Sequence, residues 1–289
     1  MNKLKTLIIA VAALVGLASC NNSGSGDYET EQNIGGCFAE AVNTATGESV
    51  TSKSVGYYLR LNYTSGLATV EVSGLELPGG LKYPTLRFSD LSFSVEDNGW
   101  KKIKGTMVTP TSTGFGSLPT FSTLEIQLLD RIAGQSYVPV IILRANVNGV
   151  ISVLSAAKLQ LFAGETVSVS PSGDRYKSTE TMYVVSLDFE KMTAGIQLTG
   201  ARFVEAMPSM DITFKDVPFT YSSGRILLKR DALIPEMGNT PQPSYPISNL
   251  MADFDISKGM ELGFDCSVHG ATYHVDAHLE YNPKTDEKK

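Results

Sequence analysis

The three histidines of the chain, His269, His274 and His278, fall within ten residues near the C-terminus. His274, Asp276, His278 and Glu280 alternate with other residues, so a β-strand would place these four side chains on one face. Histidine and carboxylate groups together can ligate zinc and activate water for hydrolysis. However, His274 and His278 would lie about 13 Å apart along a strand rising roughly 3.3 Å per residue. A solvated strand face explains the same pattern, so we predict no metal site and keep His274, Asp276 and His278 only as metal candidates.

Asp90 and Asp216 are the carboxylates that stand out, because each lies between aromatic residues in two similar segments. Acid–base chemistry would need a second acid within reach, and the sequence identifies none. Aspartate also favours turns, where it bonds to nearby backbone, so we expect a structural role. The chain contains no nucleophile elbow, phosphate-binding glycine loop or CxxC pair. We therefore expect no catalytic residues, no cofactor and no enzymatic activity.

Two groups of residues could bind a ligand without catalysing a reaction. Trp100 with Tyr57 and Tyr58 could stack on a sugar ring, although ordinary packing also explains these aromatics. The stronger candidates are the long loops at residues 108–120 and 233–247, which are rich in Pro, Ser, Thr and Gly. Long loops on a rigid β scaffold commonly carry function, although they can equally be variable spacers.

Within these two loops, Phe115 and Tyr245 are the aromatic residues that we expect to contact a ligand. A small molecule, a glycan or another envelope protein would each fit such loops. The formal net charge is −6, and no basic cluster is present, which argues against nucleic acid as a partner.

The first 19 residues predict a signal peptide. Lys3 and Lys5 precede an apolar stretch at residues 7–17 that is too short for an ordinary transmembrane helix. The stretch ends in Leu17-Ala18-Ser19-Cys20, which resembles the lipobox of bacterial lipoproteins. The resemblance implies cleavage before Cys20 and attachment of acyl chains such as palmitate, which would anchor the protein to the membrane. An ordinary secretory signal ending near a cysteine is the alternative.

Residues 20–33 would then form the lipidated cysteine and a flexible polar tether. Surface-exported lipoproteins of Bacteroidota tend to carry an acidic run directly after this cysteine. Here the acids Asp27, Glu29 and Glu31 come late and are few. We expect an outer-membrane lipoprotein that faces the periplasm, with the cell surface as the alternative.

Cys37 and Cys266 remain as thiols in an oxidising compartment. A disulfide would require their Cα atoms to lie within roughly 7 Å of each other. Ala145 corresponds to Cys266 when the turns Asn148-Gly149 and His269-Gly270 are matched, which indicates a small, inward position. We expect two separate buried thiols.

The predicted strands that position these residues belong to an internal sequence repeat with two copies. Residues 58–95 align without a gap on residues 184–221, at an offset of 126, with six identities among 38 pairs. The identical residues are Leu61, Ala68, Gly74, Phe88, Asp90 and Phe93 in the first copy. The apolar pattern between the identities agrees as well, so the chain contains a duplicated unit.

Each copy reads as about eight antiparallel strands. Residues 67–77 alternate in strand fashion, and Asn148-Gly149 and His269-Gly270 predict hairpin turns near the end of each copy. Residues 122–125 resemble a helix capping box, but residues 250–256 of the second copy alternate with strand period. We therefore predict strands in both places.

The predicted fold is all-β: two tandem homologous antiparallel domains, each a barrel or a sandwich. The first domain covers residues 34–161 and the second covers residues 162–282, followed by a polar tail at residues 283–289. Cys20 and the paired segments at residues 88–93 and 214–219 give the chain a resemblance to small β lipoproteins of Bacteroidota, including those with calycin-like barrels. Many members of that group have no known activity.

The function that we expect is a non-catalytic envelope lipoprotein that serves as a ligand-binding or accessory module. The ligand would lie in a barrel interior or on the paired loops. A structural, fimbrillin-like assembly subunit is the alternative, because such subunits are also lipidated two-domain β proteins. A metal-dependent hydrolase using His274 and His278 is the third hypothesis.

Overall fold

The computed structural model describes residues 28–97, 99–112, 118–129, 140–222, 224–256, 258–268 and 270–280. Within them the chain forms strands and turns and no helix. The all-β prediction is therefore confirmed. Contacts divide the chain into two compact units with a boundary between Ala157 and Lys158. This boundary lies four residues before the predicted one.

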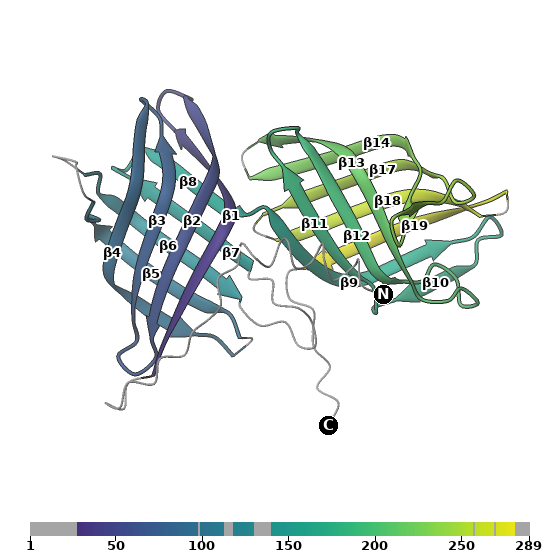
Figure 1. The fold of residues 1–289 in the computed structure, drawn as a ribbon, viewed down its shortest axis with the longest axis horizontal. Helices are drawn as coiled ribbons and strands as arrows, with labels where there is room; N and C mark the ends of the chain where they lie inside the picture. The colour runs from purple at the N-terminus through teal and green to yellow at the C-terminus, as the bar shows by residue number, and fades with distance from the viewer. Residues whose placement is uncertain are drawn as a thin grey trace. The chain divides into compact units, whose positions relative to one another are not determined.

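The first unit is a closed barrel in which each strand pairs with its neighbours along the chain and β1 pairs with β8 (Figure 1). Sheet closure decides between the two predicted architectures in favour of the barrel. Its strands are β1 (Glu29–Asn43), β2 (Ser49–Asn62), β3 (Leu67–Leu77), β4 (Leu81–Val95), β5 (Lys101–Val108), β6 (Phe121–Leu129), β7 (Val140–Val147) and β8 (Ile151–Ala157).

The second unit also closes on itself, because β12 pairs with β13 and β9 pairs with β19. Its strands are β9 (Leu159–Val169), β10 (Arg175–Ser178), β11 (Met182–Asp188), β12 (Thr193–Ala201), β13 (Met210–Ser222), β14 (Arg225–Leu233), β15 (Glu236–Met237), β16 (Thr240–Pro241), β17 (Ile247–Asp255), β18 (Gly259–Val268) and β19 (Ala271–Glu280). The short β10, β15 and β16 lie outside the ring of eight strands.

Two strand boundaries differ from the prediction. β1 begins at Glu29, before the predicted start of the first domain at residue 34. The prediction missed these residues because Thr30 and Gln32 are buried although they are polar, so they give no apolar signal. The predicted first domain ends at residue 161, but β8 ends at Ala157 and β9 begins at Leu159. Leu159 already pairs with Ser186 of the second barrel. Lys158 and Gln160 therefore belong to the second unit, and Gln160 is fully buried.

The remaining local predictions agree with the structure. Residues 121–129 and 247–255 are strands, so the apparent capping box does not start a helix. Asn148 and Gly149 both have positive φ, at 52° and 74°, and Val150 N–H donates to Val147 O at 3.2 Å. Both values fit the hairpin turn predicted there. His269 of the second predicted turn lies outside the described residues.

Asp90 and Asp216 have the same role in the two barrels. Their φ angles are 57° and 52°, and each lies in a bulge where two residues of one strand oppose a single residue of the neighbour. Aspartate tolerates this left-handed conformation better than most residues. β4 pairs with β5 only at residues 92–95, on the C-terminal side of the bulge. The structural role predicted for both aspartates is confirmed.

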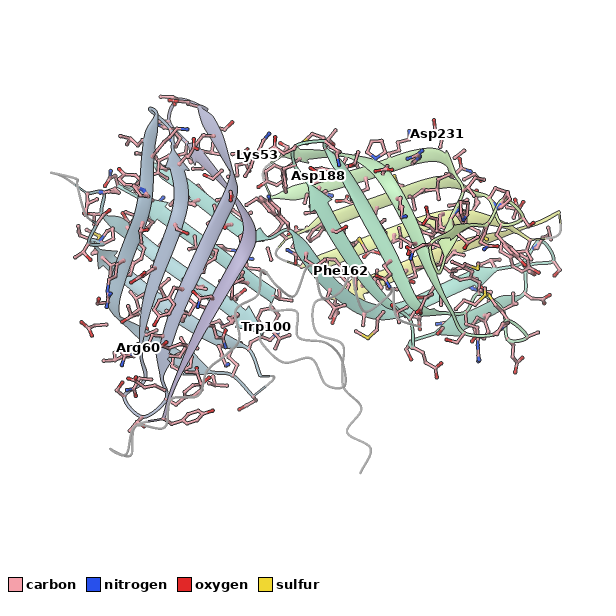
Figure 2. All side chains as sticks on the ribbon, viewed as in Figure 1. Lys53, Arg60, Trp100, Phe162, Asp188 and Asp231 are labelled. Carbon is pink, nitrogen blue, oxygen red and sulfur yellow. The ribbon has the colours of Figure 1, made fainter. Side chains whose placement is uncertain are left out.

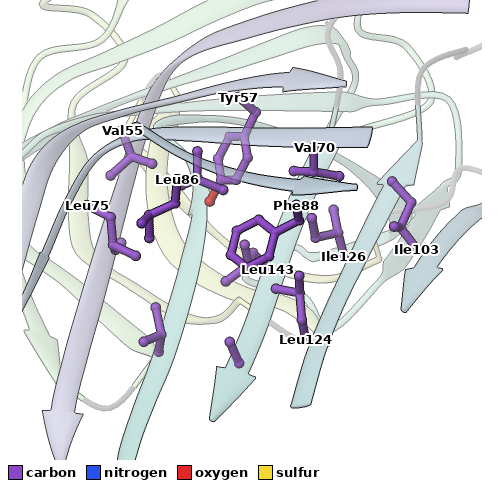
Figure 3. Close-up of a cluster of buried hydrophobic side chains, with 14 of the residues drawn as sticks. Val55, Tyr57, Val70, Leu75, Leu86, Phe88, Ile103, Leu124, Ile126 and Leu143 are labelled. Carbon is purple, nitrogen blue, oxygen red and sulfur yellow. The ribbon is translucent and has the colours of Figure 1, made fainter. Parts of the chain in front are cut away.

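Side chains fill the interior of the first barrel. A single cluster of buried apolar residues from all eight strands occupies it, including Tyr57, Leu86, Phe88 and Leu143 (Figure 3). Phe88 and Phe121 meet edge-to-face with ring centroids 4.8 Å apart. Such packing follows from the alternation of inward apolar and outward polar residues along each strand.

The interior of the second barrel is likewise packed with aromatic rings. Phe214 and Phe264 have centroids 5.2 Å apart, and Phe162 and Phe254 have centroids 5.1 Å apart. The segment after β12 inserts Phe203, which is 5% exposed and packs 5.6 Å from the Phe264 ring. Apolar burial of this kind is the main stabilising contribution in both units.

The two interiors share a polar pattern that the aligned segments do not include. Gln32 and Gln160 are buried on the first strand of each barrel, opposite Leu59 and Val185, which are 126 residues apart. Tyr57 and Tyr183 are also equivalent at the offset of 126. The Tyr57 hydroxyl donates to Ser155 Oγ at 2.5 Å, and that of Tyr183 lies 2.7 Å from Thr166 Oγ1.

Burial raises the pKa of both tyrosines, and that of Tyr183 reaches about 12. Both therefore remain neutral hydrogen-bonding groups. The recurrence of a buried glutamine and a buried tyrosine extends the duplication to the first strand of each unit.

We predict that Asp90→Val and Asp216→Val each lower the free energy of unfolding by about 1–2 kcal/mol, because a β-branched residue is strained at positive φ. Asp90→Gly and Asp216→Gly should have little effect or a small stabilising one. Ser94→Val, at an exposed position of β4 with ordinary strand conformation, is the control. Urea unfolding of the soluble chain measures all five, and equal stability of the Val and Gly variants would refute the strain.

Candidate functional site

The predicted histidine face exists on the outer wall of the second barrel. β19 exposes His274, Asp276, His278 and Glu280, while Val275, Ala277 and Leu279 of the same strand are buried. β19 lies between β18 and β9, so the four side chains face residues of both neighbouring strands. Alternation along a strand thus placed this face correctly.

His274 is bound by two acids. Its Nδ1 lies 2.7 Å from Asp265 Oδ1, and its Nε2 lies 3.3 Å from Asp276 Oδ2. Asn249 Nδ2 donates to the other oxygen of Asp265 at 2.6 Å. The hydrogen bond to Asp265 is the main cause that raises the pKa of His274, and the same bond lowers the pKa of Asp265.

His278 has a different partner, because its Nδ1 contacts Glu261 Oε1 of β18. The two histidines are therefore held by separate acids and do not converge. Across the described residues, no group of three or more His, Cys, Asp or Glu side chains is arranged to hold a metal ion. His274 and His278 thus bond to separate acids of β18, and Asp276 bonds to His274 within β19, so their geometry gives the hydrolase hypothesis no support.

A shallow hollow of about 300 Å³ lies beside these residues, over Gly263. Gly263 is one of its lining residues, together with the acids Glu165, Asp253, Glu261 and Asp276. These acids already have partners: Lys177 Nζ lies 2.9 Å from Glu165, and Arg225 pairs with Asp253. Exposed pairs of this kind contribute little to stability, and they leave the hollow a solvated part of the wall.

Trp100, Tyr57 and Tyr58, weighed as a sugar-stacking group, do not share one surface, which leaves ordinary packing as their role. Tyr57 is buried inside the first barrel, whereas Tyr58, as the next residue of β2, points to the outer wall. Successive strand residues face opposite sides of a sheet. Trp100 lies in the turn between β4 and β5 and is half-buried.

The two candidate loops fold back onto equivalent strand positions. In the first barrel Thr111 and Arg87 exchange two backbone hydrogen bonds of 2.8 Å. In the second barrel Glu236 of β15 pairs with Thr213, which corresponds to Arg87 at the offset of 126. Each loop therefore covers the edge that the aspartate bulge leaves on β4 or β13, and has a structural task.

Of the two aromatic residues expected to contact a ligand in these loops, Tyr245 falls within the described residues. Tyr245 is half-buried in a turn in which its N–H donates to Gln242 O at 3.0 Å. Phe115 lies outside the described residues. The second loop is also not irregular throughout, because β15 and β16 form a short hairpin within it.

Cys37 and Cys266 are free thiols, and each is buried in a different barrel. Cys37 points into the first barrel, and burial raises the pKa of Cys266 to about 11. The expectation of two separate buried thiols agrees with this arrangement. Cys20 lies outside the described residues.

A group of residues that the sequence reasoning missed lies at one end of the first barrel. Tyr63 packs against Tyr28 and Phe93, with ring centroids 4.9 Å and 5.1 Å away. Lys101 Nζ lies 5.7 Å from the centroid of the Tyr63 ring, in the range of a cation–π contact.

We call this region the Trp100 end, defined by Tyr28, Tyr63, Phe93, Val95 and Trp100. Trp100 lies at the same end of the barrel as Arg60, whereas Lys53 lies towards the other end (Figure 2). Tyr28 is 54% exposed and Val95 is 52% exposed. Strand order could have predicted this grouping. In an up-and-down barrel, the β2–β3 and β4–β5 turns lie at the same end as the start of β1.

The corresponding end of the second barrel exposes an aliphatic side chain, that of Met192 in the β11–β12 turn, which is 38% exposed. Its aromatic rings Phe189 and Phe219, which correspond to Tyr63 and Phe93, are 3% and 4% exposed. Arg225, the first residue of β14, stands near the position of Trp100. The exposed tyrosine of the first barrel, Tyr28, therefore has no counterpart in these two rings.

No protein-family model matches the chain, and no curated protein and no solved structure matches it significantly.

Within the described residues, no helix is long and apolar enough to cross a membrane.

We predict that His274 titrates above its ordinary pKa of 6.5 and that Asp265→Asn lowers this pKa more than Asp276→Asn does. A raised folded-state pKa stabilises the protein fully below 6.5, and this stabilisation is lost as pH rises through the raised value. His274→Gln should therefore reduce stability more at pH 5.5 than at pH 9. NMR titration and urea unfolding measure the two effects, and an unshifted His274 pKa would contradict the pairing.

We also predict that Cys37 and Cys266 of a Cys20→Ser chain do not react with a thiol reagent at pH 8, because the fold buries both and the pKa of Cys266 lies near 11. Two thiols should react after denaturation. An intact mass that rises by two hydrogens on reduction would reveal a disulfide and refute this expectation.

Proposed function

We propose that the protein is a non-catalytic lipoprotein of the bacterial outer membrane that serves as a binding or accessory module. Acyl chains on Cys20 would anchor it, with its two barrels on the periplasmic side. The lipobox-like sequence at residues 17–20 and the polar segment after it support the anchor.

The filled barrel interiors are the observation that carries the proposal of a surface-acting module. Barrels that carry a ligand inside keep a cavity there. Here Phe88 and Phe121 pack across the first interior, and Phe162, Phe214 and Phe264 pack within the second. We therefore assign recognition to the outer surfaces and barrel ends, with an envelope component as the partner.

A fimbrillin-like assembly subunit fits the fold less well. Assembly by strand exchange would require proteolytic release of the N-terminal strand. β1 pairs with β2 along most of its length and with β8 from Cys37 to Asn43, so it closes the first barrel on both sides. Its removal would open the ring and expose the apolar interior to water.

We predict that native and denatured mass spectra of the Cys20→Ser chain, expressed without its signal, give the same protein mass. Filled interiors leave no space for a co-purifying small molecule. A native-only mass increase that matches an organic ligand would contradict the assignment of recognition to the surface. The fold of the sample is checked by the buried thiols, which should stay unreactive before denaturation.

A further inference from the structure

We propose that the Trp100 end of the first barrel rests on the membrane surface, where it contacts the lipid headgroups and the upper part of the acyl chains. This inference rests on the proposed anchor at Cys20 and assigns the surface that the anchor brings to the membrane.

The position of the chain start supports this orientation. The first described residue, Tyr28, belongs to the Trp100 end: its N–H donates to Thr64 Oγ1 at 3.2 Å, and its carbonyl accepts from Tyr63 N–H at 2.9 Å. Cys20 precedes Tyr28 by only eight residues, which span at most about 28 Å when fully extended. An acylated Cys20 therefore keeps this end of the barrel close to the bilayer.

The chemistry of the surface fits an interface between water and lipid. Tyrosine and tryptophan are enriched at headgroup depth, because each has an apolar ring and a polar group. Tyr28, Tyr63 and Trp100 provide three such rings, and Trp100 is the single tryptophan of the chain. Val95 adds exposed aliphatic surface beside them.

Two acids near this end have cationic partners, while Asp97 of the β4–β5 turn is exposed. Glu29 is paired with Arg60 and also accepts from Asn62 Nδ2 at 2.9 Å. Glu96 is paired with Lys102 across the β4–β5 turn. Paired acids repel anionic headgroups less than isolated ones, because each cation offsets the neighbouring charge.

The second barrel provides an internal comparison. The same hairpin end buries its aromatic rings, Phe189 and Phe219, and has an arginine near the position of Trp100. The duplicated scaffold therefore does not require exposed aromatics. The exposed ring of Tyr28 belongs to the copy that follows the tether, whereas the second copy exposes the aliphatic Met192 at this end.

The test attaches the soluble chain, beginning at Cys20, to vesicles of phosphatidylethanolamine and phosphatidylglycerol that contain a maleimide lipid. Cys37 and Cys266 are buried, so Cys20 is the thiol that couples. Trp100 fluorescence is then recorded with and without lipids brominated near the headgroup. We expect a blue shift on attachment and quenching by the brominated lipids.

A Tyr28→Ser, Val95→Ser double variant should lower the quenching by about half or more, because it removes apolar surface from the contact. Leu81→Ser is the matched control, since Leu81 is 47% exposed in the first barrel but lies in the turn region at its opposite end. Circular dichroism verifies the fold of each variant. Unchanged emission and no quenching in chains that sediment with the vesicles would overturn the proposal.

The maleimide lipid replaces natural acyl chains, so this experiment tests the docking surface separately from the anchor. The mass of the protein extracted from its native envelope tests the anchor. Acyl chains on Cys20 are expected there, and an unmodified Cys20 would refute the anchor without altering the vesicle result.

Discussion

Backbone hydrogen bonding along both edges of every strand is the constraint on which both units depend. A sheet of eight strands has two open edges unless its first and last strands pair. β1 meets β8 in the first unit, and β9 meets β19 in the second, so each sheet becomes a ring. Closure then separates an inner from an outer face, and the alternation of side chains along every strand follows from it.

The ring also explains where irregular features are found. A small barrel bends its strands strongly, and bulges supply such bends. Asp90 and Asp216 provide the bend at the same position in both rings. On the N-terminal side of each bulge, β4 no longer pairs with β5 and β13 no longer pairs with β14. Thr111 and Glu236 then satisfy the backbone that this separation exposes. The paired loops that invited a functional interpretation thus have a structural cause.

The sequence predicted the elements whose local pattern is strong. Alternation placed β3 and the exposed face of β19 correctly, and the internal repeat identified residues 121–129 as a strand against the helix signal. Polar residues inside the barrel hid the start of β1, because Thr30 and Gln32 give no apolar signal. An alternating strand pattern that continues across Lys158 hid the division between β8 and β9.

The Trp100 end was not predictable from local pattern. Its members come from the start of β1, the β2–β3 hairpin and the β4–β5 turn, and only the three-dimensional ring brings them together. Trp100 was instead grouped with Tyr57 and Tyr58, although one of these tyrosines faces the core. Barrel closure and strand count are the facts required for the correct grouping, and alternation alone does not distinguish a barrel from a sandwich.

An even number of strands has a consequence for how this chain grew. In an antiparallel ring of eight, the last strand runs back towards the end at which the first strand began. The chain can then start another unit at once, and here a single residue, Lys158, separates β8 from β9. Tandem duplication of such a unit therefore needs no long connection between the copies.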